Sequence, residues 1–257
     1  MRNENYWGGG KIMFKLVTYD INIIKSAFAG ITEVVDEIQI QLDDEGLRLN
    51  ALDKPHMVFV HLELKSSVFD EYSIHGPLSL NIDTVEFMKV LNRCKPKDIL
   101  TLESDGDNII ITFEGESTRT FKIRLIDLEY EAPVPPSIDY DFQVELPVTL
   151  LKDALSDISV FSDKLHIRRE VEDNHIYIDG NNDFGETSTK YELDIIGNAK
   201  VDSTYNLEKI KEFMKSEKFS NMIIIKSGVN IPLIIEFECN GGVLSYLLAP
   251  RIEQNEE

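Results

Sequence analysis

The sequence predicts an α+β fold of two similar domains, each made of antiparallel sheets with two helices on one face. Three observations support this prediction: apolar and polar residues alternate along most of the chain, four helical stripes recur at nearly equal spacing, and a proline-rich segment separates the two halves. The chain has 257 residues, of which 42% are hydrophobic. This length and composition suffice to bury a core in one large or two medium domains.

The strands are predicted from an alternation of apolar and polar residues with a period of two. It is clear over residues 38–42, 58–64, 109–113 and 121–125, and again over residues 165–167, 176–178, 235–237 and 244–248. One apolar face and one polar face are typical of an antiparallel sheet with one side in water. Polar turn sequences at residues 43–46 and 105–108 indicate hairpins between such strands.

Four stretches replace this period with the helical spacing of apolar residues. Two stripes are strong, at residues 21, 24, 28 and 31 and at residues 148, 151, 155 and 158. Two are weaker, at residues 85, 88 and 91 and at residues 207, 210 and 214. We therefore predict helices over residues 21–34, 83–93, 147–160 and 206–219. Asp83 and Asn206 are suitable N-caps for the second and fourth helices.

The even spacing of the helices indicates an internal repeat. The stripes begin at residues 21, 85, 148 and 207, at intervals of 64, 63 and 59 residues. A repeat of this kind predicts a duplicated arrangement of helices and strands. The alternative is an ordinary α+β domain whose helices are evenly spaced by coincidence. A shift of 127 residues supports the repeat, because it pairs Val17, Ile24, Ala27, Ile31, Ile38 and Ile40 with Val144, Leu151, Ala154, Ile158, Leu165 and Ile167.

The domain boundaries follow from composition. Residues 128–141 contain Pro133, Pro135 and Pro136, which remove backbone donors and favour an extended conformation, so this segment is predicted to be a connector of some stiffness. The first domain is then expected at residues 13–127 and the second at residues 142–253. Residues 1–12 are polar and glycine-rich and are interpreted as a disordered N-terminal extension, and residues 254–257 as an acidic tail.

Charge is distributed unevenly along the chain. The 46 acids exceed the 26 bases by 20, which argues against a uniformly basic protein that coats nucleic acid and against binding to anionic membranes. The four predicted helices, however, carry eight acids and eight bases, so the remaining sequence holds the entire negative excess. One interpretation is that lysines on wet helix faces only aid solubility. The other is a surface that meets phosphates, and its bases are Lys25, Lys89, Arg93, Lys152, Lys209, Lys211, Lys215 and Lys218.

The usual motifs of catalysis are absent from the sequence. It has no nucleophile elbow, phosphate-binding loop, H-E-x-x-H or C-x-x-C motif, and no two of its five histidines have the helical spacing of a metal pair. We therefore expect a protein that is not an enzyme and that has no metal or other cofactor. The two cysteines, Cys94 and Cys239, and the lack of an apolar run of about 18 to 20 residues favour a location in the reducing cytosol.

Four short motifs resemble those of one family. They are the tail Tyr246-Leu247-Leu248-Ala249-Pro250-Arg251-Ile252-Glu253, the L-D-x-x-H element Leu52-Asp53-Lys54-Pro55-His56-Met57, the sequence Ile231-Pro232-Leu233, and Leu125-Ile126-Asp127-Leu128 before the connector. On these motifs, residues 13–253 resemble the DNA sliding clamps of the archaeal and eukaryotic type, the proliferating cell nuclear antigen family. The resemblance implies the DNA clamp fold of that family.

The resemblance also implies an assembly. Three identical chains would form a homotrimeric ring whose twelve helices surround double-stranded DNA without sequence preference, and the ring would act as a processivity factor in the cytoplasm, at the nucleoid of a prokaryote. Of the helical bases, Lys25, Lys89 and Lys152 best match lining positions of the family. We expect the ring to close through edge strands near residues 109–113 of one chain and 176–178 of the next. The alternatives are one subunit of a heterotrimeric clamp and, without support from the sequence, a β-rich hydrolase.

The family further has a groove for short peptide motifs of its partners, which for this chain would be DNA polymerase, the clamp loader, flap endonuclease and DNA ligase. Such an apolar groove beneath the connector would receive an apolar or aromatic side chain of the peptide. Carried over to this sequence, its residues are Leu52, His56, Met57, Phe59, Pro133, Val134, Pro232, Leu247, Leu248, Ala249, Pro250 and Ile252.

Overall fold

The computed structural model describes residues 12–128, 132–171 and 174–251. The predicted acidic tail, and the predicted N-terminal extension except for Ile12, lie outside these residues. The first half contains β1 (Phe14–Thr18), α1 (Ile21–Val34), β2 (Glu37–Asp43), β3 (Gly46–Leu52), β4 (Val58–Lys65), the 3-10 turn η1 (Ser66–Val68), β5 (Glu71–Ile74), β6 (Leu78–Asp83), α2 (Thr84–Leu91), β7 (Ile99–Ser104), β8 (Asn108–Glu114) and β9 (Thr118–Arg124).

The second half follows the connector with the same order of α-helices and strands. It contains β10 (Phe142–Pro147), α3 (Val148–Ile158), β11 (Lys164–Arg169), β12 (His175–Asn182), β13 (Gly185–Glu192), β14 (Ile195–Ile196), β15 (Val201–Asn206), α4 (Leu207–Phe213), the 3-10 turn η2 (Met214–Ser216), β16 (Met222–Ser227), β17 (Leu233–Cys239) and β18 (Gly242–Leu248).

Each half pairs its strands into two antiparallel sheets. The strand orders are β5-β1-β7-β8-β9 and β4-β3-β2-β6 in the first half, and β14-β10-β16-β17-β18 and β13-β12-β11-β15 in the second. β18 pairs with β4, which merges one sheet of each half into a single sheet of nine strands. The pairing of the second half therefore repeats that of the first strand for strand, as expected for a duplicated fold.

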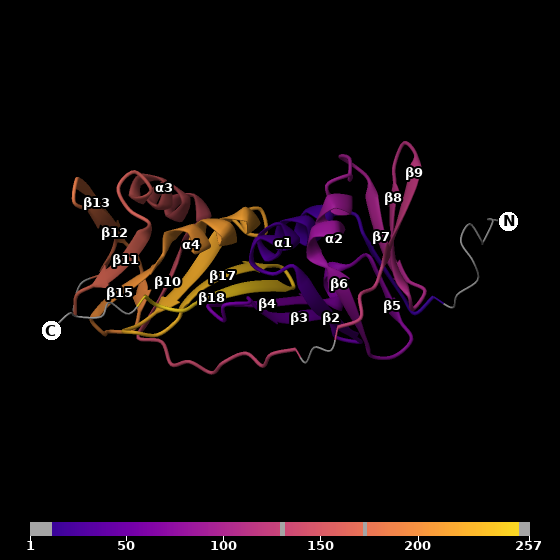
Figure 1. Cartoon of the computed structure of the whole chain (residues 1–257), viewed down its shortest axis with the longest axis horizontal. Coiled ribbons are helices and arrows are strands. Elements are labelled where there is room, and N and C mark those ends of the chain that lie inside the picture. Colours follow the sequence, from indigo (N-terminus) through magenta and orange to yellow (C-terminus); the bar gives the residue numbers. More distant parts are fainter. Residues whose placement is uncertain (1–11, 129–131, 172–173, 252–257) are drawn as a thin grey trace.

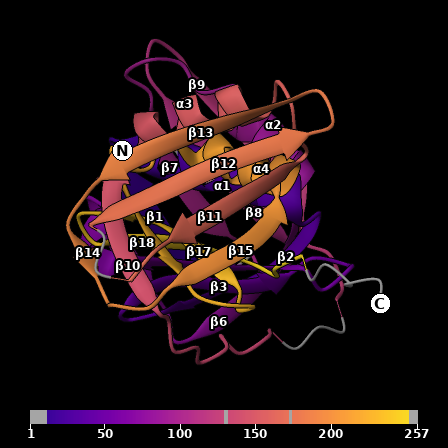
Figure 2. The same cartoon turned by 90° about the vertical axis from the view of Figure 1, so that its left-hand side faces the viewer.

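All four helices lie on one side of the sheets, and the connector runs along the opposite side (Figure 1). Seen from the end of the molecule, the four-stranded sheet of the second half faces the viewer, with the connector along the lower edge (Figure 2). The core lies between helices and sheets. It includes the buried stripe of α1, with Ile24, Ala27 and Ile31, and the matching stripe of α3, with Leu151, Ala154 and Ile158. No helix among the described residues is long and apolar enough to cross a membrane.

Side-chain caps fix the N-termini of α1, α2 and α4, whereas α3 begins after Pro147 without one. Asp83 accepts a hydrogen bond from the backbone N–H of Glu86 at 2.8 Å, and Asn206 accepts one from Lys209 at 3.2 Å, so both predicted caps are confirmed. Asp20 caps α1 in the same way. The predicted ends were too long, because α2 stops at Leu91 and α4 gives way to the η2 turn after Phe213.

A close contact of α1 with η2 joins the helical layers of the two halves. The Ser216 hydroxyl lies 2.8 Å from the Tyr246 hydroxyl, and both groups are buried. Gly30 of α1 faces this pair, and a Cβ atom at that position would lie only 2.3 Å from either oxygen. The Tyr246 ring also stacks on Phe213, with the ring centroids 4.5 Å apart. Gly30 is therefore required for this approach of the two halves.

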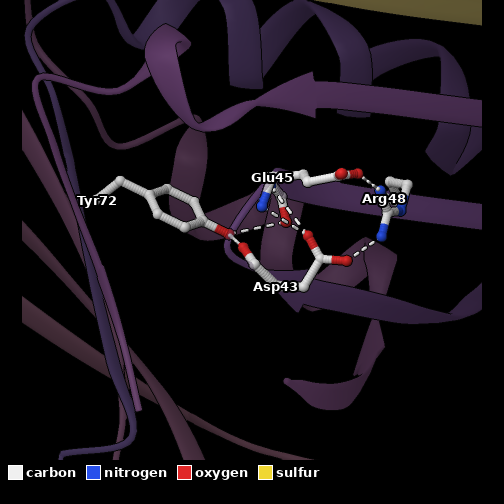
Figure 3. Close-up of polar contacts among 5 residues, drawn as sticks. Asp43, Glu45, Arg48 and Tyr72 are labelled. Atoms are coloured by element: carbon white, nitrogen blue, oxygen red, sulfur yellow. Dashed lines mark hydrogen bonds and ion pairs between the residues drawn. The ribbon is translucent and has the colours of Figure 1, made fainter. Parts of the chain in front are cut away.

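A polar contact fastens β5 to the β2–β3 hairpin, the turn predicted at residues 43–46 (Figure 3). The Tyr72 hydroxyl lies 2.6 Å from the carbonyl oxygen of Asp43 and 2.8 Å from that of Gly46, and shares its proton between them. Partial burial there raises the pKa of Tyr72 to about 12. Arg48 forms ion pairs with Asp43 and Glu45, which neutralise part of the acidic turn.

The shift of 127 residues is wrong for the first strand of the repeat. Val17 is half-buried and faces away from the core, whereas Val144 is buried. The buried residues Phe14 and Leu16 instead occupy the places of Phe142 and Val144, so β1 and β10 differ by 128 residues. The offset between the two halves is therefore one residue larger in the first strand than in the helix. An offset that is wrong by one residue assigns every side chain of a strand to the opposite face of the sheet.

The prediction of the edge strands was also wrong. Residues 109–113 belong to β8, which lies between β7 and β9, and residues 176–178 belong to β12, which lies between β11 and β13. The edges that correspond to the paired strands β18 and β4 are β9 and β13. Both have polar residues on their outer face, such as Lys122 and Glu186, which is typical of protected edges.

Candidate functional site

The helical face carries all eight basic residues that the sequence singled out. Lys25 on α1 is half-buried, and Lys209 and Lys211 on α4 are also half-buried. The others are exposed, on or directly after α2, α3 and η2. The four helices share one side of the sheets (Figure 1), so these charges belong to the helical layer; the exposed members are Lys89, Arg93, Lys152, Lys215 and Lys218.

Half of these bases are paired with carboxylates of the same surface. Four ion pairs have Nζ–O distances between 2.6 and 2.9 Å: Lys89–Glu86, Lys152–Glu217, Lys209–Glu212 and Lys211–Glu208. The hydrogen bond to Glu86 raises the pKa of Lys89. Within the described chain, the bases of the set without such an ion pair are Lys25, Arg93, Lys215 and Lys218, so the surface has fewer unpaired positive charges than its sequence indicates.

Two more bases lie beside this surface and were not predicted. Lys95 and Lys97 are exposed in the loop that follows α2, and Lys97 has a left-handed backbone with φ of 71°. The sequence analysis counted only helical residues, so it passed over them. A basic doublet around Pro96, shortly after Lys89 and Arg93, was the available signal.

The opposite side of the nine-stranded sheet has an apolar row that crosses four strands. Leu52 of β3 pairs with Phe59 of β4, Phe59 with Leu247 of β18, and Leu247 with Ile234 of β17. Phe59 and Leu247 are only 6% and 8% exposed, yet neither belongs to the main core, because their neighbours along each strand point to the helices. Leu52, Phe59 and Leu247 were predicted for the groove, whereas Ile234 was missed.

The end of this row is shaped by the loop between β3 and β4. Asp53 accepts hydrogen bonds from the backbone N–H groups of Met57 and Val58 at 2.7 and 2.8 Å, which fixes the loop. His56 is exposed and has a left-handed backbone, with φ of 59°. The backbone N–H of Ala249 donates to the carbonyl of Met57 at 2.9 Å. The structure thus brings the L-D-x-x-H element and the C-terminal tail together.

A polar row runs next to the apolar one and bounds it. His61 Nδ1 lies 2.7 Å from the Asn50 side-chain oxygen, and Ser245 donates to Glu236 at 2.8 Å. Lys226 forms an ion pair with the same Glu236 at 3.0 Å. Burial lowers the pKa of His61, so the imidazole is neutral near pH 7. These side chains satisfy one another, and the apolar row is left as the surface for contact.

Backbone hydrogen bonds hold the chain just before the connector and at its last residue. The N–H of Ile126 donates to β6 at 3.0 Å, and that of Asp141 to β16 at 3.0 Å. Pro133 is half-buried, whereas Val134 is 84% exposed. The buried hydroxyl of Tyr140 has no hydrogen-bond partner among the described residues, and burial raises its pKa.

The remaining groove residues differ in position. Pro232 and Pro250 are half-buried next to the row. Leu248 is fully buried in the core beneath the helices, because the residue after Leu247 points to the other face of β18, so it offers no surface to a partner. Ile252 lies outside the described residues. No cluster of three or more metal-ligating side chains occurs in the described part of the chain.

Comparison with known proteins identifies the family. Residues 13–132 match the N-terminal domain of proliferating cell nuclear antigen. The DNA polymerase sliding clamp of Methanothermobacter thermautotrophicus is 47% identical over 250 residues, which cover 95% of this chain and all of the relative. That of Methanobrevibacter smithii is 45% identical over 246 residues, covering 95% and 100% of the two chains.

Solved structures share the fold. Proliferating cell nuclear antigen of Entamoeba histolytica matches 94% of this chain and 100% of its own, with a TM-score of 0.87 at 23% identity. The PCNA2–PCNA3 complex of Sulfolobus tokodaii matches 93% of this chain and 100% of the solved chain, with a TM-score of 0.85 at 23% identity. The chain therefore belongs to the proliferating cell nuclear antigen family of DNA polymerase sliding clamps, which are processivity factors and not enzymes.

Proposed function

We propose that three copies of this chain close into a homotrimeric ring around duplex DNA, with the helical faces inside and the apolar rows outside. The observation that carries the proposal is the repeated strand order, which leaves β9 and β13 as unpaired counterparts of β18 and β4. Two different edges at opposite ends of one chain favour head-to-tail contacts between chains. Such contacts form a ring when the rotation from one chain to the next divides a full turn evenly. The number of three rests on the resemblance to the family.

The internal β18–β4 junction gives the register of the contact between chains. Following the matched strand ladders, Phe121 of β9 takes the place of Tyr246, and Thr187 of β13 takes that of Val60. Because Tyr246 lies opposite Val60, Phe121 should lie opposite the next chain's copy of Thr187. The same shift places Thr120 opposite Ser188.

The charges of the two edges fit this register. Lys122 comes to lie opposite Glu186 on the outer face, an opposite-charge pair of the kind that stabilises adjacent strands. In the single chain Lys122 forms an ion pair with Asp105 at 2.6 Å. The ring would thus place the lysine between two carboxylates, one from its own chain and one from its neighbour.

The helical face suits DNA that must slide. Each base that binds a phosphate contributes to affinity by releasing counterions, so eight free bases in each of three chains would grip the duplex. Four of the eight are already paired with acids. Retention would then come from the closed ring, and the acidic remainder of the chain would repel DNA from the outside.

The apolar row and the loop at His56 would bind short peptide motifs of client proteins. Phe59, Leu247 and Ile234 offer an apolar floor, and the polar row at Glu236 limits it on one side. An aromatic or aliphatic anchor on such a floor is the usual centre of a peptide interface. We propose DNA polymerase, the clamp loader, flap endonuclease and DNA ligase as clients, acting at the nucleoid in the cytoplasm.

Cysteine cross-linking tests the ring and its register together. The Cα atoms of opposite residues in antiparallel strands lie about 4.5–5.5 Å apart, within the range that a disulfide spans. The double variant Thr120→Cys and Ser188→Cys should give covalent dimers and trimers on oxidation, while each single variant should not. Thr120→Cys with Lys190→Cys, shifted by two residues, is the matched control. A native protein that sediments as a stable monomer of 29.4 kDa, or preferential cross-linking of the shifted pair, would refute the model.

A second candidate is a ring that contains related but different chains. The similarity of this chain to the solved PCNA2–PCNA3 complex, which contains two different clamp chains, supports this candidate. Sedimentation of the purified protein alone distinguishes the two, because only a homotrimer reaches three times the monomer mass without a paralogue.

A further inference from the structure

A cavity of about 300 Å³ opens at the end of β3, beside the apolar row. Its apolar walls are Val34 at the end of α1, Leu52 at the end of β3, and Leu128 at the start of the connector. Leu52 is also the first residue of the apolar row, so the cavity adjoins the proposed binding surface for client peptides.

A buried carboxylate with an unused oxygen stands in the wall of the cavity. Asp53 lines it and is only 3% exposed. Its Oδ1 accepts the two backbone hydrogen bonds that hold the Met57 loop, but its Oδ2 is buried without a partner among the described residues. A buried acceptor of this kind is unfavourable until a donor reaches it.

The lysines nearby do not donate a hydrogen bond to this oxygen, because each is paired with another carboxylate. Lys54 Nζ lies 3.1 Å from the carboxylate of Asp36, and Lys209 Nζ lies 2.8 Å from that of Glu212. Glu37 adds another acid to the wall. The cavity therefore combines an apolar lining with an excess of negative charge, a combination that fits a side chain with an aliphatic stem and a cationic end.

We propose that this cavity receives a lysine or arginine side chain of a client protein whose peptide lies on the apolar row. The proposal rests on the function proposed above. The aliphatic stem packs against Val34, Leu52 and Leu128, and the Asp53 side chain turns toward the cavity so that its Oδ2 accepts a hydrogen bond from the cationic end. An acidic side chain at that place is repelled, and an apolar one leaves the oxygen unpaired. The cavity thus selects clients with a basic residue next to their apolar anchor.

Fluorescence anisotropy with synthetic peptides tests this selection on the intact assembly. The peptides carry an aromatic anchor and one arginine, moved across the flanking positions, and each has a partner peptide with neutral citrulline in its place. At one position, arginine should bind the native protein about tenfold more tightly than citrulline, or about 1.4 kcal/mol. Asp53→Asn should reduce this ratio to less than about twofold, because the amide still accepts from the loop but presents a donor to the cavity.

Control variants separate this proposal from the function on which it rests. Asp44→Asn removes the same charge in the exposed turn at the other end of β3 and should keep the tenfold ratio. Equal affinities for the arginine and citrulline peptides at every position, with binding still abolished in Phe59→Ala, would refute the proposed role of the cavity but not that of the peptide-binding apolar row. A ratio unchanged in Asp53→Asn would also overturn it. If no peptide binds the native protein, the groove and the cavity both fail. The native comparison decides even if Asp53→Asn does not assemble.

Discussion

Replacing Gly30 by alanine should destabilise the protein, although the same change stabilises most helices. The new Cβ would lie 2.3 Å from both the Ser216 and the Tyr246 oxygens. Overpacking of this kind costs about 1–3 kcal/mol, and parting the buried hydroxyl pair costs about 1–3 kcal/mol more. The gain in helix propensity is only about 0.5–1 kcal/mol. We therefore expect a net loss of about 1–5.5 kcal/mol in the free energy of unfolding.

Urea denaturation followed by circular dichroism measures this loss, at one fixed protein concentration because assembly stabilises the chain. Ser216→Ala with Tyr246→Phe makes room for the new methyl group. In that background Gly30→Ala should cost about 1–2 kcal/mol less, since residues in contact are not additive. A stabilised Gly30→Ala protein, or strictly additive costs, would show that the contact between α1 and η2 is not as close as the structure describes.

The helical bases, the apolar row and one buried acid give further predictions. Lys25→Ala should reduce the slope of log affinity for DNA against log salt concentration by about 0.9 for each phosphate that the variant no longer neutralises. The reduction should be larger than in Lys89→Ala, because Lys89 is already paired; equal reductions would contradict this. Leu247→Ala should weaken client-peptide binding, whereas Leu248→Ala should instead cost about 2–5 kcal/mol of stability; a reversed result would mean that the faces of β18 are misassigned. The hydrogen bond from Lys122 of β9 is the main cause that lowers the pKa of Asp105 from 3.8 to about 2. The ionised Asp105 therefore stabilises the folded protein fully above pH 3.8, and this stabilisation is lost as the pH falls toward 2. Thermal melts of Asp105→Asn should lack this acid dependence.

Local signals explain what the sequence could predict. The stripes of α1 and α3 and the caps Asp83 and Asn206 act within a few residues of the chain, so their effect is visible in the sequence itself. The even spacing of the helices recognised in this way then predicted the duplicated fold. The ends of α2 and α4 were placed too late, because polar and charged residues after the last apolar position fit a helix and a turn equally well.

The edges and the faces of the strands depend on distant pairing and were harder to predict. The edges were predicted from the resemblance to the family, which placed each of them one strand too early, in β8 and β12 instead of β9 and β13. In the tail, Leu247 and Leu248 are identical residues, and only the register with Phe59 and Val58 of β4 shows which one faces outward. A shift of one residue exchanges their roles.

The two kinds of junction in the proposed ring differ in composition, and the difference suits their tasks. Within the chain, the contact of β18 with β4 is apolar toward the helices, at Tyr246, and on the outer face where Leu247 lies against Phe59, next to the polar pair of Ser245 and His61. Between chains, the same pairing would place Lys122 opposite Glu186 on the outer face. A ring can surround a long duplex only if one junction opens. Exposing a polar edge to water costs less free energy than exposing an apolar one. Opening should therefore occur between chains while the halves of each chain stay joined.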